Sequence, residues 1–407
     1  MKTADVPAAS VPAYLDDDED DEDDSEECSD DSDCRCGHDD PDNGERCHFL
    51  DVCWSLMEYP KDALHELGIM RKAFKDLDDL DRALWTSDPE TWLQNIKGRI
   101  EANGNFLRLL PVPEVCGLDL GPDGERVVCE VPERHRVASR NSSKVRSTLR
   151  QFVRDWAREG EEERLASYQP LIDALLRHLP PQRGHHPPTV LCPGSGLGRL
   201  PFDLVRNGYA AQGNEFSYHM LLGSHLILNR CRAAECFTIF PYVLGTTNRR
   251  GQTDHLRAVR IPDLCPMACL PPDARLSMAA GEFIEVYGDQ VSQWDAVASA
   301  FFLDTAKNVF LYIRTIAQMI RPGGIWTNFG PLLYHYADVG HEISIELSWE
   351  EVKPAIWKYF DMIEEETDKV SQYASNPGCL HGVRYRCVFF VAKRNNVPPS
   401  GQSHPVF

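Results

Sequence analysis

The spacing of apolar residues predicts two helical regions, followed by an alternation of strands and helices. Over residues 47–110, apolar side chains recur every three or four positions, which is typical of helices with one buried face. A second region of this kind spans residues 142–179. The Pro- and Gly-rich stretch 111–135 between them is predicted to be a loop, and "PPQRGHHPP" ends the second region.

Beyond residue 186, short apolar runs alternate with helical stretches. The strands are predicted at "TVLCPG", "YAAQGNE", "WDAVASAFFL" and "GIWTNFG". The helices between them are predicted at "LGRLPFDLVRNG", "SYHMLLGSHLILNR" and "AKNVFLYIRTIAQMIRPGG", the last with a Pro/Gly stop. This alternation of strands and helices predicts an α/β fold with a doubly wound, mostly parallel sheet.

We therefore expect four parts along the chain. They are an acidic tail over 1–42, a helical portion over 43–185, an α/β domain over 186–395 and a C-terminal tail over 396–407.

The net charge of −21 is distributed unevenly. The first 40 residues hold seventeen acids and two bases, so they carry −15 and leave −6 for the rest. So few apolar residues accompany these acids that we expect the tail to be disordered. The remainder has no basic stripe, which argues against nucleic-acid binding.

Neither a signal peptide nor an apolar stretch long enough to cross a membrane is evident. Cys192 and Cys387 lie inside apolar runs, as expected of buried, reduced thiols. These features predict a soluble protein of the cytoplasm, with the nucleus as an additional location.

Seven cysteines and histidines lie within residues 28–53, where they could form a metal site. Their spacing lacks the paired C-x2-C arrangement of structural zinc sites, so we favour unstructured thiols and expect no metal. The residues are Cys28, Cys34, Cys36, His38, Cys47, His48 and Cys53.

The glycine-rich stretch "VLCPGSGLGRL" at 190–200 is typical of a nucleotide-binding turn. A phosphate-binding loop is excluded, because Arg199-Leu200 follows Gly198 where Lys-Ser/Thr is required. A dinucleotide fingerprint needs G-x-G-x-x-G, and here the third glycine comes one residue early. The spacing of Gly194, Gly196 and Gly198 instead resembles motif I of class I S-adenosylmethionine methyltransferases.

Later markers follow in the order that this resemblance requires. Glu215, twenty-one positions after Gly194, ends a predicted strand where an acid can accept ribose hydroxyls. Glu282 with Phe283 resembles the acid-plus-apolar pair that flanks adenine. "RPGGIW" and "YRCVFFVAKR" resemble the turn before the fifth strand and the last, antiparallel strand of that fold.

Longer sequence segments narrow the resemblance to the carnosine N-methyltransferase family, over roughly residues 47–395. They include "QFVRDW", "YQPLI", "PGSGLGRL", "GYAAQGNEFSY", "LNRC", "FFLDTAKN", "GPLLYH" and "SIELS". The resemblance implies an enzyme that methylates an imidazole nitrogen of carnosine (β-alanyl-histidine) to give anserine, with related histidine peptides as further substrates. It also implies S-adenosyl-L-methionine as cofactor and a homodimer.

Site residues are carried over position by position from this resemblance. The implied cofactor-binding residues are Gln151, Arg154, Gly194, Gly196, Glu215, Glu282, Phe283 and Ala300. The implied substrate-binding residues are Asp304, His335, Tyr373 and Tyr385. The family has Asp where Glu282 stands and Cys where Ala300 stands, and both departures bear on cofactor affinity.

Asp304 is the candidate catalytic residue. Neutral imidazole has one N–H and one lone pair, and attack on a sulfonium methyl group needs only the lone pair. A carboxylate that accepts the N–H selects the tautomer and stabilises the developing imidazolium. The alternative is that Asp304 caps the helix that follows it.

Other site residues have structural alternatives, and two other functions compete. Arg154 could be a surface charge, His335 a buried core polar group, and Tyr385 a residue of ordinary hydrophobic packing.

One rival function is that of a protein histidine methyltransferase of the same fold, which needs an open groove. The other is a non-enzymatic binding protein that uses the acidic tail.

Overall fold

The computed structural model describes residues 41–85, 87–111, 142–182, 184–339 and 342–399. The acidic tail therefore lies outside the described residues, except for the first positions of helix α1. So does most of the predicted loop 111–135. Of the Cys/His cluster, only His48 and Cys53 have described side chains. Among the residues that are described, no helix combines the length and apolar content needed to cross a membrane.

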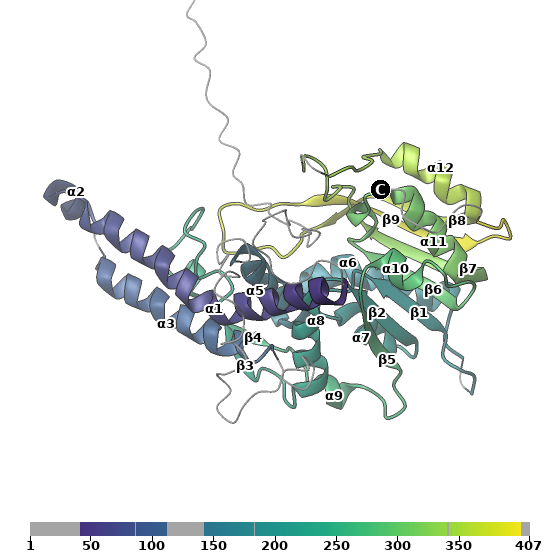
Figure 1. Ribbon diagram of the computed structural model, residues 1–407, viewed down its shortest axis with the longest axis horizontal. Coiled ribbons are helices and arrows are strands. Elements are labelled where there is room, and N and C mark those ends of the chain that lie inside the picture. Colours follow the sequence, from purple (N-terminus) through teal and green to yellow (C-terminus); the bar gives the residue numbers. More distant parts are fainter. Residues whose placement is uncertain (1–40, 86, 112–141, 183, 340–341, 400–407) are drawn as a thin grey trace, which may run out of the picture.

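The body of the protein is a seven-stranded sheet in the order β5-β2-β1-β6-β7-β9-β8 (Figure 1). β9 is antiparallel to both of its neighbours, and the other adjacent pairs are parallel. The strands are β1 (Thr189–Pro193), β2 (Ala210–Glu215), β5 (Leu276–Ala280), β6 (Trp294–Ala300), β7 (Ile320–Gly330), β8 (Phe360–Ser371) and β9 (Tyr385–Arg394). The strand order reverses direction between β1 and β6, where doubly wound sheets bind their ligands.

Helices cover both faces of this sheet, so the predicted doubly wound α/β fold is confirmed. Along β1, Val190 and Cys192 join one apolar cluster while Leu191 joins another, because successive strand residues point to opposite faces. The first face is covered by α6 (Glu161–His178) and α7 (Arg199–Arg206). The second is covered by α10 (Phe283–Tyr287), α11 (Val309–Met319) and α12 (Trp349–Tyr359).

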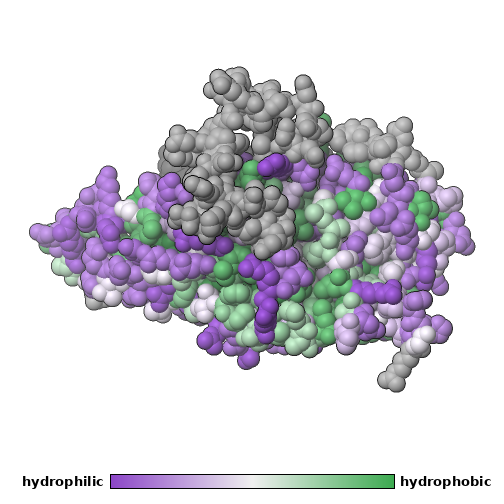
Figure 2. Space-filling model, turned by 60° about the horizontal axis from the view of Figure 1, so that its bottom comes forward, coloured by the Kyte–Doolittle hydropathy of each residue, from purple (hydrophilic) through white to green (hydrophobic). Residues whose placement is uncertain are grey.

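The N-terminal helices extend from this body as an arm (Figure 1). The arm consists of α1 (Pro41–Lys75), α2 (Asp79–Leu84) and α3 (Pro89–Leu107), with α1 and α3 side by side. Figure 2 shows the arm covered mostly by hydrophilic residues. Its apolar stripe is turned inward, as the spacing of apolar residues over 47–110 predicts.

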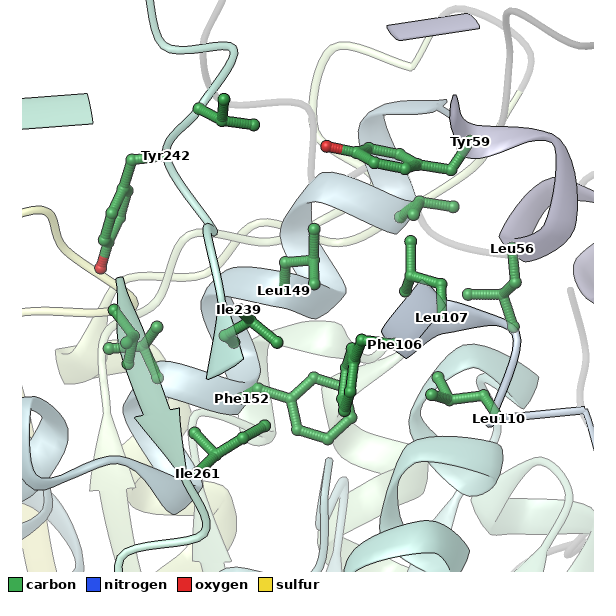
Figure 3. Packing of buried hydrophobic residues seen from close by; sticks show 14 of the residues in the cluster. Leu56, Tyr59, Phe106, Leu107, Leu110, Leu149, Phe152, Ile239, Tyr242 and Ile261 are labelled. Carbon is green, nitrogen blue, oxygen red and sulfur yellow. The ribbon is translucent and has the colours of Figure 1, made fainter. Parts of the chain in front are cut away.

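The base of the arm packs on α5 (Ser142–Trp156), α8 (Tyr218–His225) and a small antiparallel sheet of β3 (Phe237–Ile239) and β4 (Val259–Ile261). Figure 3 shows side chains from α1, α3, α5, β3 and β4 meeting there. The rings of Phe106 and Phe152 lie 5.1 Å apart between centroids. The sequence pattern did not predict β3 and β4, because three residues are too short to show alternation. The remaining short elements are η3 (Arg158–Gly160), η4 (Leu226–Arg230), η5 (Asp254–Leu256), α9 (Pro266–Cys269) and η6 (Leu303–Thr305).

Two predicted boundaries are wrong. The strand predicted over "WDAVASAFFL" ends at Ala300, because Phe301 takes a left-handed φ of +52°, far outside the β region. The helix predicted over "AKNVFLYIRTIAQMIRPGG" ends at Met319, and β7 begins at Ile320, so "RPGG" lies within the strand instead of ending the helix. Ile320 pairs with Trp294 before the register shifts, which accounts for the early start.

His255 is a buried histidine, and we expect it to make the stability of the fold depend on pH. Both ring nitrogens are buried and lack a hydrogen-bond partner among the described residues, and the ring lies 5.6 Å from that of Trp92. Burial, followed by the charge of Arg249, lowers the pKa of His255 from 6.5 to about 4. The folded protein therefore holds this imidazole neutral at a pH where the unfolded chain protonates it.

We expect His255 to destabilise the fold as the pH falls from about 7.5 to about 5, by roughly 2 kcal/mol. The unfolded chain binds more protons across this window, so stability rises with pH there. A His255→Leu variant should lose this part of the pH dependence in urea denaturation followed at both pH values. The exposed His186→Leu serves as control, and equal pH dependence in both variants would count against the assignment.

Candidate active site

The glycine turn leaves the carboxyl end of β1 and enters α7. Gly194, Gly196 and Gly198 all have left-handed backbone, with φ of +60°, +54° and +78°. A Cβ on Gly194 would lie 2.8 Å from Cδ2 of Phe302, so any other residue would have to displace that ring. The turn therefore depends on glycine for both conformation and space.

Glu215, at the end of β2, contacts this turn. Its carboxylate accepts from the backbone N–H of Gly196 at 2.7 Å, and from Phe216 and Ser217 at 2.9 and 3.0 Å. The predicted ribose-binding acid therefore lies beside the glycine turn, although the two are nineteen residues apart along the chain.

Glu282 and Phe283 follow β5 at the same edge of the sheet. Glu282 Oε2 caps α10 by accepting from the amides of Ile284 and Glu285, at 2.5 and 2.9 Å. Burial raises the pKa of Glu282, although these amides oppose the change. The Phe283 ring lies 5.2 Å from that of Phe302, which links the predicted adenine site to the Gly194 turn.

Arg154 is buried among aromatic rings on α5, so the surface-charge alternative is wrong. Its side chain is 6% exposed, and its Cζ lies 4.5 Å from the ring centroid of Tyr373, 4.9 Å from Tyr168 and 5.2 Å from Phe301. Nε lies 2.9 Å from Oε1 of Glu163. This contact is an ion pair without hydrogen-bond geometry, and both Nε and Nη2 are buried with no hydrogen-bond partner within the described part of the chain.

The unpartnered Nη2 of Arg154 fits the carboxylate of an amino-acid moiety, because a buried guanidinium N–H without an acceptor is costly. Gln151, one helical turn earlier, donates from Nε2 to the hydroxyl of Tyr373 at 2.7 Å. Two residues predicted for the cofactor thus contact one predicted for the substrate.

Asp304 lies in the short helix that follows β6 and is 1% exposed. Its Oδ2 accepts from the Leu333 amide at 2.8 Å, and its backbone oxygen accepts from the His335 amide at 3.1 Å. Burial raises the pKa of Asp304, and the opposing effects of His335 and the Leu333 amide do not cancel it. The helix-cap alternative is wrong, since Asn308 caps α11.

Phe301 is a residue of the site that the sequence analysis missed. Between Ala300 and Asp304, its left-handed backbone turns the ring toward Tyr373, at 4.8 Å between centroids, and toward Tyr385, at 6.4 Å. Tyr385 therefore packs against a ring of the site itself. No sequence signal marks a non-glycine residue for positive φ.

Asp155 is a second missed residue, although it lies in the quoted "QFVRDW". It is fully buried, and its Oδ2 accepts from the Leu197 amide of the glycine turn at 3.3 Å. Its Oδ1 accepts from the Tyr168 hydroxyl at 2.9 Å. Asp155 thus fixes the turn against α5 and α6.

The structure gathers the predicted residues at the carboxyl edge of β1, β2, β5 and β6. Ala300 ends β6 and is buried, His335 is half-buried in the loop after β7, and Tyr373 follows β8. Of the described cysteines, Cys192 and Cys387 are buried free thiols, as predicted.

Comparison with known proteins identifies the family. A family model described as carnosine N-methyltransferase matches residues 132–396. Carnosine N-methyltransferase of Rattus norvegicus is 35% identical over 363 residues, or 88% of each chain. That of Schizosaccharomyces pombe is 46% identical over 200 residues, or 48% of this chain and 54% of that protein.

Among solved structures, the N-methyltransferase NodS from Bradyrhizobium japonicum, in complex with S-adenosyl-L-homocysteine, matches with a TM-score of 0.34 and 11% identity. The match covers 58% of this chain and 88% of that chain. The family model spans well over half of the sequence, and the rat protein aligns along most of it. The chain therefore belongs to the carnosine N-methyltransferase family and is an N-methyltransferase.

Proposed function

We propose that this protein transfers a methyl group from S-adenosyl-L-methionine to an imidazole nitrogen of carnosine, giving anserine. The observation that carries the proposal is a buried carboxylate, Asp304, directly after β6, with His335 beside it. The carboxyl end of this strand adjoins the glycine turn across the switch point of the sheet.

The residues at the sheet edge suit the parts of the methyl donor. Arg154 Nη2 and Gln151 bind its carboxylate end, and Glu215 binds the ribose. Phe283 and Glu282 flank the adenine, and Ala300, buried at the end of β6, lines the donor site. The donor supplies an electrophilic methyl group on a sulfonium centre.

Asp304 does three things for the acceptor. It accepts the N–H of one imidazole nitrogen, which leaves the lone pair of the other pointing at the methyl group. It also stabilises the positive charge that develops on the ring, and it takes the ring proton as the methylated product forms. Its raised pKa suits the acceptance of this proton. Holding a ring in line can supply up to ~7–11 kcal/mol of such a barrier.

Methyl transfer from radiolabelled S-adenosyl-L-methionine to carnosine tests the proposal directly. We expect labelled anserine, identified by NMR and by comparison with authentic standards, and weaker transfer to related histidine dipeptides. Failure to label any of these would overturn the substrate assignment. Stronger labelling of unfolded histidine-containing proteins than of dipeptides would favour a protein histidine methyltransferase. The homodimer and the cytoplasmic location stay predictions.

A further inference from the structure

Glu163, in the first turn of α6, joins the predicted donor site to the segment that carries Tyr373. Its side chain is 9% exposed. Its Oε1 lies 2.9 Å from Arg154 Nε and also accepts from the Ala374 amide at 2.9 Å. One carboxylate oxygen thus connects α5 to a residue 211 positions away in sequence from Glu163 itself.

Two further contacts tie the same elements together. The Tyr373 hydroxyl accepts from Gln151 Nε2 at 2.7 Å, and the Tyr373 ring stacks on the Arg154 guanidinium at 4.5 Å. The position of Tyr373 therefore depends on the positions of Gln151 and Arg154.

The segment after β8 is also held from its other side. Arg257 Nη1 donates to Asn376 Oδ1 at 2.5 Å, and the Tyr242 hydroxyl donates to the Ser375 carbonyl at 3.3 Å. Arg257 is itself fixed by Glu159, at 2.9 Å. These contacts anchor residues 375–376, and Glu163 sets the adjacent Ala374 relative to Arg154, which together with Gln151 holds Tyr373.

A buried ion pair is a poor source of stability, because desolvation offsets most of its attraction. Burial raises the pKa of Glu163, and Arg154 and the Ala374 amide oppose the change. The geometry offers another use for the pair. Arg154 forms an ion pair with Glu163 through Nε and leaves Nη2 for another acceptor, so the two carboxylates would orient one rigid planar group.

We propose that Glu163 is a positioning residue that couples the methyl-donor site to the dipeptide site. Engagement of Arg154 Nη2 by the donor carboxylate fixes the guanidinium against Glu163 and Tyr373. Ala374 and Tyr373 are thereby set in the position that receives the dipeptide. This inference rests on the proposed function, because it assigns the two ligands to these sites.

Coupling of this kind is reciprocal. The donor product and the dipeptide should each tighten the binding of the other by the same factor, which we expect to be about tenfold. Calorimetric titration of S-adenosyl-L-homocysteine, with and without saturating carnosine, measures one side. Titration of carnosine, with and without saturating S-adenosyl-L-homocysteine, measures the other.

Two variants separate coupling from simple structural support. Glu163→Ala should abolish the tenfold factor, while S-adenosyl-L-homocysteine alone binds within about threefold of wild type. Glu163→Gln should retain part of the factor, because the amide oxygen still accepts from Ala374 but no longer pairs with Arg154. In both Glu163 variants, KM for carnosine should rise with little change in kcat. Glu162→Gln, exposed in the same helical turn, is the matched control and should match wild type.

The outcomes distinguish this inference from the function on which it rests. Binding of both ligands without mutual tightening in wild type overturns the coupling alone, and this measurement needs no variant. An undiminished factor in folded Glu163→Ala, with folding checked by circular dichroism, overturns the role of Glu163. Failure of wild type to bind carnosine at all overturns the proposed function and the coupling together.

Discussion

Replacing Asp304 with asparagine should lower kcat/KM for carnosine about a thousandfold, while S-adenosyl-L-homocysteine binds within about twofold of wild type. Asparagine keeps an oxygen for the Leu333 amide, so the loop after β7 should hold its place. It removes the negative charge that stabilises the imidazolium and accepts its proton. Steady-state kinetics with a saturating methyl donor, together with calorimetry, measure both quantities.

Asp361→Asn is the matched control for this variant, because Asp361 is exposed on β8. It should keep wild-type kinetics. A value of kcat/KM for Asp304→Asn within tenfold of wild type would show that the carboxylate is not the group that prepares the imidazole.

Replacing Gly194 with alanine should weaken the binding of S-adenosyl-L-homocysteine about a hundredfold. Two effects add. The left-handed φ of +60° costs about 1 kcal/mol for any residue with a Cβ. The new methyl group would also lie 2.8 Å from Phe302 and displace a ring that packs on Phe283.

Gly184→Ala separates these two effects. Gly184 also has a left-handed φ, of +80°, but a Cβ there would meet nothing within 4 Å. We expect it to lose a little stability and to keep its affinity, as measured by thermal unfolding and calorimetry. Equal affinities in the two alanine variants would contradict the role assigned to the Gly194 turn.

Much of the α/β body could be predicted because its signals are local. The strand predicted at "YAAQGNE" corresponds to β2, and Glu215 ends it. Alternating apolar runs and glycine spacing act within a few residues, so they can be recognised without knowing the partners of each strand. For the same reason, the prediction failed where a backbone conformation is imposed from outside, as at Phe301 and at the start of β7.

The candidate site was predicted only in part, because its residue types were evident but their contacts were not. Asp304 was marked by its place after a strand, and Glu215 by its distance from the glycines. Asp155 and Glu163 gave no such signal, since a buried acid on a helix resembles any surface acid in sequence. Arg154 was ambiguous for the same reason until its burial was known.

The sequence by itself predicted β1, β2, β6, β7 and β9 in their order along the chain, the glycines of the turn and the family resemblance. Those features follow from periodicity and from residue types that are nearly alone in fitting a given backbone. The tertiary structure decided that Gln151 meets Tyr373 and that Glu163 meets Ala374, across 222 and 211 residues of chain. These contacts arise when the segment after β8 returns beside α5 and α6, and no local pattern encodes the packing of such distant segments.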